Sequence, residues 1–201
     1  MDTQIAEEIQ PHRKADHEID ALFLNRWSPR AFSSEPLDDV TLNRVFEAAR
    51  WAPSSMNEQP WRFIIARSAE DRARFVEFLM PPNQAWAKDA PVLVVIVAKT
   101  TFSHNGSPNP VAAFDAGCAW GFLSLAAVQQ GLITHGMAGF YKDQAATALE
   151  LPEDYEAVAV IALGKRGNTA NLSEQLRERE KPSGRRSLEE TVMEGRFKAP
   201  A

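Results

Sequence analysis

The sequence predicts one α/β domain in which helices and strands alternate. Four segments have strand character, and residues 91–98 form an aliphatic, β-branched run that is typical of a strand buried on both faces. Segments with apolar residues at helical spacing separate these strands. No repeat, low-complexity block or change of composition divides the chain, so we expect a single domain over residues 1–201.

Two helices are expected before the first strand. Residues 16–25 carry apolar side chains at helical spacing, and residues 38–51 carry an apolar face behind a possible N-cap, Asp38. Pro53 ends the second helix because proline has no backbone N–H to donate. Residues 1–13 are polar, and we expect them to be mobile.

The remaining elements alternate along the chain. Strands are expected at residues 61–66, 91–98, 132–140 (a short strand that leads into a glycine turn) and 155–163. Helices are expected at residues 69–79, 111–130 and 142–149. Residues 99–110 are rich in turn formers and predict a surface loop that could act as a lid. Residues 168–201 predict a polar, extended C-terminal arm with a short helical piece at 188–193.

The helix at 111–130 has an unusual composition. One predicted face carries Phe114, Cys118, Phe122 and Leu125, and several alanines and glycines keep the helix thin. Such a helix suits a dimer interface, although a helix buried inside one monomer would have the same pattern. Cys118 is the sole cysteine, which excludes an intramolecular disulfide, and we expect it to be a buried, inert residue.

Composition and motifs exclude several classes of function. The net charge of -5 and pI near 5.5 give no general attraction for nucleic acid or an anionic membrane. With no long apolar run and no basic, apolar leader, a cytoplasmic protein is expected. The four histidines lack zinc-site spacing, so no metal is expected, and the glycine motifs of Rossmann and P-loop sites and the G-x-S-x-G hydrolase elbow are absent from the sequence.

Two polar clusters stand out. In Arg26-Trp27-Ser28-Pro29-Arg30, two guanidinium groups flank a hydroxyl in a segment that Pro29 keeps extended, and such groups can clamp phosphate oxygens. Taken alone, the cluster could equally be a pair of solvated arginines. The second cluster, residues 52–61, is Ala-Pro-Ser-Ser-Met-Asn-Glu-Gln-Pro-Trp, and taken alone it would suit an ordinary loop between a helix and a strand.

Together the two clusters resemble the flavin-binding signature of the nitroreductase family, and the resemblance runs from Arg26 through Phe63. It implies an FMN site in which the first cluster, Arg26, Trp27, Ser28 and Arg30, contacts the phosphate, ribityl and pyrimidine. The second cluster, Pro53, Ser54, Ser55, Met56 and Asn57, would lie against the isoalloxazine from the other subunit. The resemblance also implies a central mixed sheet of about four to five strands surrounded by helices, in a homodimer whose C-terminal extension reaches the partner subunit.

Three further places resemble the family. Asn83 corresponds to a contact with the pyrimidine, and the turn with Met137, Ala138 and Gly139 corresponds to the backbone donors that face flavin N5. Ala138 stands where some members have Glu, and Trp86 stands where some have Lys. In the arm, the resemblance does not decide which of Lys181, Arg185 and Arg186 meets the phosphate.

The resemblance implies an NAD(P)H-dependent flavin oxidoreductase. Hydride would pass from NADH or NADPH through flavin N5 to a nitroaromatic, a quinone or a similar flat acceptor by a ping-pong mechanism. Residues 99–110 with Phe102, Phe140 and Tyr141 would select this acceptor. Two alternatives stay open: a related flavoenzyme that performs dehalogenation, flavin fragmentation or dehydrogenation, and a non-catalytic flavin-binding protein.

Overall fold

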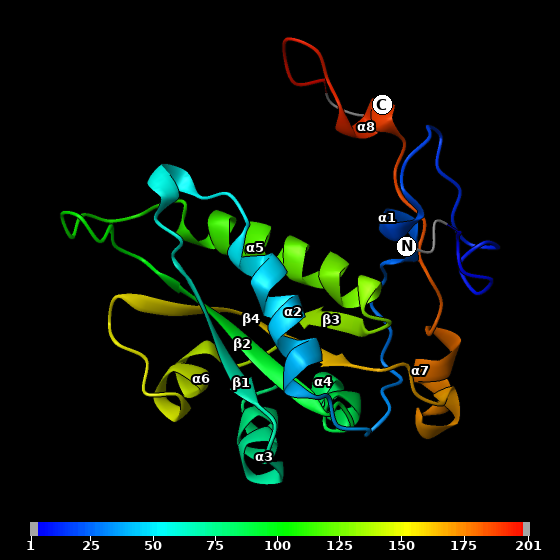
Figure 1. The fold of residues 1–201 in the computed structure, drawn as a ribbon, viewed down its shortest axis with the longest axis horizontal. Coiled ribbons are helices and arrows are strands. Elements are labelled where there is room, and N and C mark those ends of the chain that lie inside the picture. Colours follow the sequence, from blue (N-terminus) through cyan, green and yellow to red (C-terminus); the bar gives the residue numbers. More distant parts are fainter. Residues whose placement is uncertain (1–3, 199–201) are drawn as a thin grey trace.

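One four-stranded sheet with helices on both faces organises the computed structural model, which describes residues 4–198 (Figure 1). The strands are β1 (Trp61–Ala66), β2 (Val92–Lys99), β3 (Ile133–Met137) and β4 (Tyr155–Gly164), in the order β1-β2-β4-β3. The α/β class and the positions of all four strands are therefore confirmed.

The helices are α1 (Ala21–Asn25), α2 (Asp39–Arg50), α3 (Ala69–Glu77), α4 (Pro81–Ala87), α5 (Ala112–Gln129), α6 (Lys142–Ala148), α7 (Glu174–Glu178) and α8 (Leu188–Thr191), with 3-10 turns at Ser55–Asn57 and Thr169–Asn171. Asp38 caps α2 as expected, because its carboxylate accepts from the N–H of Thr41 at 2.7 Å. The first helix begins at Ala21 rather than at residue 16. Helix α4 was not expected; it begins with Pro81, a residue favoured at the first helical position.

The sheet is antiparallel in every pairing of the described strands, which corrects the expected mixed sheet. The reason lies in the position of β4. Strands β2 and β3 both pair antiparallel with β4, so they run in the same direction but are separated by the last strand of the chain. Strands β1 and β4 likewise run in the same direction, with β2 between them, so no two parallel strands are neighbours.

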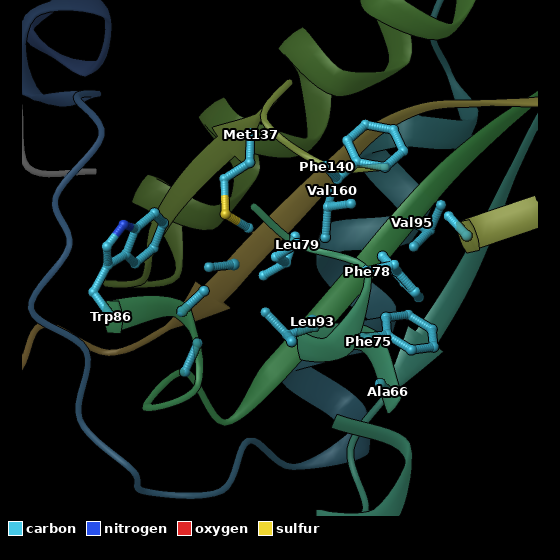
Figure 2. Packing of buried hydrophobic residues seen from close by; sticks show 14 of the residues in the cluster. Ala66, Phe75, Phe78, Leu79, Trp86, Leu93, Val95, Met137, Phe140 and Val160 are labelled. Atoms are coloured by element: carbon cyan, nitrogen blue, oxygen red, sulfur yellow. The ribbon is translucent and has the colours of Figure 1, made fainter. Parts of the chain in front are cut away.

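Strand β2 alternates between two cores. Leu93, Val95 and Val97 face a core under α3, α4 and α6, part of which Figure 2 shows, whereas the residues between them face α2 and α5. Both cores are apolar, which explains why this strand has almost no polar positions. The register between β2 and β4 shifts at Ile96/Val97, which leaves Val158 as the extra residue of a β-bulge.

Helix α5 packs on the sheet through its small residues, and this corrects the expected burial of Cys118. Ala112, Ala116, Ala119, Leu123 and Ala127 are buried in the core. Phe114, by contrast, is 73% exposed, Phe122 is also exposed, and Cys118 is half-buried rather than buried. The predicted aromatic face exists, but it points away from the sheet because alanines allow the closer approach.

A short pairing beyond β4 carries the first polar cluster. Ser33 N–H donates to the carbonyl of Lys165 at 3.0 Å, and Gly167 N–H donates to that of Ala31 at 2.8 Å. A Cβ on Gly167 would lie 2.3 Å from the Phe32 backbone, so only glycine permits this approach. The residues directly after Arg30 are thereby fixed to the end of β4.

The two terminal segments lie beside α1 (Figure 1). Within residues 1–13, expected to be mobile, Ile9 is 1% exposed and Arg13 is buried, whereas most of the other described residues are exposed. Residues 1–3 and 199–201, which belong to the expected N-terminal segment and C-terminal arm, lie outside the described residues. No helix between residues 4 and 198 combines the length and the apolar character needed to cross a membrane.

Candidate functional site

The first polar cluster lines a cavity of about 320 Å³ whose wall is strongly cationic. Trp27, Ser28, His135 and Ser183 form part of the wall, and the rest consists of the basic residues Arg13, Arg26, Arg30, Arg179, Lys181 and Arg185. None of the lining residues is acidic. We refer to this site as the anion cavity, because a multiply charged anion would balance its wall.

Burial and mutual repulsion act on these guanidinium groups. Burial lowers the pKa of Arg26, and the nearby charge of Arg185 lowers it further. The pKa of Arg13 is lowered by burial first and then by Arg185 and Arg26. Neighbouring cations therefore make Arg13 and Arg26 less stable in their charged form, and a bound phosphate would reverse this effect.

A buried carboxylate fixes the arm against the first cluster. The side chain of Glu180 is 1% exposed and accepts from the N–H of Arg30 at 2.8 Å and of Ala31 at 2.9 Å. It also pairs with Arg166, whose guanidinium lies 4.9 Å from the ring centroid of Trp27. Arg179 and Lys181, on either side of Glu180, are thus delivered to the cavity wall.

Arg13 joins the N-terminal segment to the same place. Its guanidinium donates to the carbonyls of Ser183 at 2.9 Å, Leu24 at 2.8 Å and Arg26 at 2.7 Å. The carbonyl of Ser183 belongs to the arm, that of Leu24 to helix α1, and that of Arg26 to the first residue of the first cluster. Arg13 therefore acts as a structural bridge as well as a cation of the wall.

His135 is a neutral residue of the cavity wall. Its Nδ1 lies 3.0 Å from the carbonyl of Pro29, so Nδ1 carries the proton, and its ring packs 4.5 Å from that of Trp86. Burial lowers the pKa of His135 to about 4, although the hydrogen bond to Pro29 acts in the opposite direction. At neutral pH this ring adds no further positive charge.

The turn after β3 offers two backbone donors. Within residues 4–198, the N–H groups of Ala138 and Gly139 make no hydrogen bond. The carbonyl of Gly139 accepts from Met80 N–H and from the amide of Asn83, both at 3.0 Å. Asn83 therefore supports this turn from behind, and its contact with a pyrimidine stays a prediction. Met137 is buried in the core (Figure 2), so only its backbone can face a ligand.

The second cluster forms a strained loop held by side chains. Met56, Asn57 and Gln59 have φ of 53°, 56° and 49°, in the left-handed region that favours glycine. Asp115 accepts from Ser55 N–H at 3.0 Å, and Ser54 Oγ accepts from Gln59 N–H at 3.0 Å. The conformation is thus imposed from outside the loop, and it presents Met56 at 75% exposure.

One chain does not bring the two clusters together. The second cluster contacts the N-terminal part of α5 through Asp115, whereas α1 and the first cluster lie near its C-terminal end (Figure 1). An 18-residue helix is about 27 Å long. The anion cavity lacks Pro53, Ser54, Ser55, Met56 and Asn57.

Residues 99–110 form a closed turn. Thr101 bridges to Pro108, and Ser103 N–H donates to the carboxylate of Glu58 at 2.8 Å, which ties this loop to the second cluster. Phe140, expected to help select an acceptor, is instead 4% exposed in the core. Tyr141 is partly exposed and keeps that possible role.

The basic residues of the C-terminal arm do not all line the anion cavity. Lys181 and Arg185 line the anion cavity, whereas Arg186 lies outside its wall. Sequence reasoning missed four residues that shape the site, namely Arg13, Asp115, Glu180 and His135. Glu180 lies in an alternating charged run that is typical of a solvated segment, so no local signal distinguished it. Among the described residues, no group of three or more His, Cys, Asp or Glu side chains could hold a metal ion.

The comparisons with known proteins agree with these motifs. The model of the Nitroreductase family matches residues 24–83 and 78–165. The chain belongs to the nitroreductase family. A relative from Streptomyces coelicolor, provisionally named an NADH dehydrogenase/NAD(P)H nitroreductase, is 29% identical over 72% of this chain and 81% of its own length.

Solved structures extend the family likeness. A crystal structure described as an oxidoreductase containing FMN is 42% identical, with a TM-score of 0.89 over 94% of this chain and 97% of that chain. A nitroreductase family protein from Clostridium novyi NT has a TM-score of 0.66 at 23% identity over 76% of this chain and 87% of that one. The second likeness shows the fold alone.

Replacing the buried carboxylate should destabilise this nitroreductase family member. Glu180→Gln removes the charge that Arg166 and two N–H groups share, so we expect a loss of about 3 kcal/mol in the free energy of unfolding. Urea titration measures this loss. Glu178→Gln, on the exposed side of α7, is the matched control. Equal midpoints for the two variants would contradict the structural role of Glu180.

His135 should make folding sensitive to mild acid. The pKa of His135 is about 4 in the folded protein against an ordinary 6.5, so the unfolded chain binds the proton first as the pH falls. The stability is complete above pH 6.5 and declines towards pH 4, by about 2 kcal/mol between pH 7 and pH 5. Urea titrations at both pH values should show a smaller decline for His135→Gln than for His17→Gln, a surface control. An identical decline in both would refute the assignment.

Proposed function

We propose that this protein is an FMN-dependent oxidoreductase that transfers hydride from NADH or NADPH to a flat conjugated acceptor. The observation that carries the proposal is the anion cavity, which gathers six basic residues and no acidic one on a chain whose net charge is -5. A phosphate monoester with about two negative charges suits such a wall. The structure at 42% identity is described as containing FMN.

Different residues of the anion cavity would contact different parts of FMN. We assign Arg26, Arg30, Lys181 and Arg185 to the phosphate, and Trp27 and Ser28 to the ribityl chain; all six line the anion cavity. Arg13 and Glu180 hold these groups in position rather than serving as the main ligands. Arg30 is half-buried, and burial lowers its pKa, so an anion gains more from it than from an exposed arginine.

FMN, when bound, supplies the hydride chemistry, and the chain supplies orientation and access. The free N–H groups of Ala138 and Gly139 are the donors that would orient the reactive edge of the ring. Met80 and Asn83 hold the carbonyl of Gly139 and so fix the direction of these donors. This arrangement explains why no acid/base pair of side chains is needed.

The acceptor is a nitroaromatic, a quinone or a similar planar molecule in this proposal. Such a site selects flat shape more than one functional group, with Phe102 and Tyr141 among the residues available to contact it. Donor and acceptor would use the same open face in turn, which gives ping-pong kinetics. We place the enzyme in the cytoplasm, where reduced dinucleotides are supplied by metabolism.

A flavin test decides the central claim. Purified protein should absorb near ~370 and ~450 nm, and NAD(P)H added under anaerobic conditions should bleach these bands, because the flavin accepts the hydride. Arg26→Ala should weaken FMN binding by about 2 to 4 kcal/mol, whereas Arg74→Ala on α3 should not. Colourless protein that FMN cannot reconstitute would overturn the proposal, and flavin that resists NAD(P)H would indicate a non-catalytic protein.

We also propose that the enzyme is a homodimer in which the second cluster of one subunit completes the anion cavity of the other. The support comes from surfaces left exposed by a single chain: Phe114 and Phe122 on α5, Met56 in the strained loop, and Leu188, Val192 and Phe197 on the arm. An interface would cover these large apolar side chains, which stand exposed on three separate parts of the single chain. The C-terminal arm would then reach the partner subunit.

Charge placed on the exposed face of α5 should separate the subunits. Phe114→Glu together with Phe122→Glu should give a monomer that loses FMN, since a buried, unpaired carboxylate opposes association. Sedimentation measures the mass and absorbance measures the flavin. Val40→Glu, on the exposed side of α2, is the control. A monomer that retains FMN, from either the parent or the variant chain, would defeat the shared-site model.

A further inference from the structure

A second cavity adjoins the anion cavity. It measures about 330 Å³ and lies between the N-terminal segment, α1 and the arm. Arg13 and Arg185 line both cavities, so the two form one continuous basic surface. The wall of the second cavity also contains His12, Lys14, Asp16, Phe23, Leu24, Gly184, Arg186 and Ser187. No residue of the first or the second polar cluster lines it.

The charges of this cavity are unbalanced. Arg13, Lys14, Arg185 and Arg186 take part in none of the ion pairs among residues 4–198, and all four line this one cavity. Asp16 is the one acidic residue of the wall. On a chain with 27 acidic and 22 basic residues, four cations without carboxylate partners around one cavity indicate a site for an anionic ligand.

Hydrogen bonds to backbone carbonyls hold two of the basic residues of this cavity in place. Arg13 is 9% exposed, and its Nε and Nη1 donate to backbone carbonyls, which fixes the plane of the guanidinium. Arg185 Nη1 donates to the carbonyl of Gly184 at 2.8 Å, which holds its stem along the arm. A preorganised cation costs less entropy to pair with a ligand than a free surface chain does.

Part of the cavity wall is apolar. Phe23 on α1 is 54% exposed and lies in the wall beside Leu24. An exposed ring next to several cations suits a phosphorylated nucleotide, because the base can stack on the ring while the phosphate pairs with the basic groups. Inorganic phosphate would use the cations but would gain nothing from Phe23.

We propose that the second cavity binds the adenosine end of NADPH, with the 2′-phosphate on Lys14 and Arg186 and the adenine against Phe23. The proposal rests on the proposed hydride-transfer function, which requires a reduced dinucleotide. A 2′-phosphate carries about two negative charges that NADH lacks, so this cavity selects NADPH over NADH. The N-terminal segment thereby gains a role, since it supplies His12, Arg13 and Lys14.

Isothermal titration with adenosine 2′,5′-bisphosphate tests the site without turnover. The bisphosphate should bind at least about tenfold more tightly than AMP or inorganic phosphate, since a charge-assisted pair contributes about 1.5 to 3 kcal/mol and tenfold needs 1.4. Lys14→Ala should weaken the bisphosphate about tenfold, and Phe23→Ala should weaken bisphosphate and AMP alike. Arg196→Ala, on the arm but in neither cavity wall, is the matched control and should change neither affinity.

Steady-state rates give an independent measurement. Lys14→Ala should raise KM for NADPH about tenfold more than KM for NADH, as loss of a 2′-phosphate contact requires. Equal binding of bisphosphate and inorganic phosphate, or bisphosphate affinity that Lys14→Ala leaves unchanged, would overturn the inference. The titration is made whether or not the purified protein carries flavin. Failure of the flavin spectrum therefore refutes the proposed function, and failure of the titration refutes this site alone.

Discussion

The buried carboxylate of Glu180 is the interaction on which the site depends. A charge taken out of water costs several kcal/mol unless it is paired and hydrogen-bonded, and Glu180 meets this requirement with groups from distant parts of the chain. The N–H groups of Arg30 and Ala31 come from the first cluster, and the guanidinium comes from Arg166 beyond β4. Satisfying one carboxylate therefore fixes the arm, the cluster and the end of the sheet relative to one another. The cations that flank Glu180 reach the anion cavity as a consequence.

Both halves of the site contain features that folding alone would not favour. The anion cavity concentrates like charges, which lower the pKa of Arg13 and Arg26 in addition to the effect of burial. The second cluster holds three residues in left-handed conformations at a cost of about 1 to 3 kcal/mol each. In each case a buried acid from elsewhere opposes the cost: Glu180 for the first cluster and Asp115 for the second. Clustered cations and left-handed backbone conformations are both unfavourable for folding, and such unfavourable features are expected at ligand sites.

Local patterns predicted much of this fold, and long-range contacts account for the differences. Strand β2 was predictable because burial on both faces needs apolar residues at every position. The antiparallel sheet was not, because it depends on the insertion of β4 between β2 and β3. The burial of Cys118 was predicted wrongly, because the alanines of α5 pack against the sheet and leave this thiol half-buried. Arg26 and Arg30 belong to a local motif and were predictable. Arg13 and Glu180 lie 13 and 150 residues from the groups that they hold, and their local sequence resembles solvated surface.

The separation of the two clusters along α5 has a thermodynamic consequence under the proposed dimer. The basic wall of the anion cavity comes from one chain, so we expect the affinity for phosphate to belong to the monomer. The strained loop at the other end of α5 can meet the ring of the cofactor only in trans. FMN then binds the dimer more tightly than the monomer, and by linkage it stabilises the dimer by the same free energy. Apparent FMN affinity would rise with protein concentration until dimerisation is complete, while the affinity for a simple phosphate ester would not. This difference separates a shared flavin site from a cavity that acts alone.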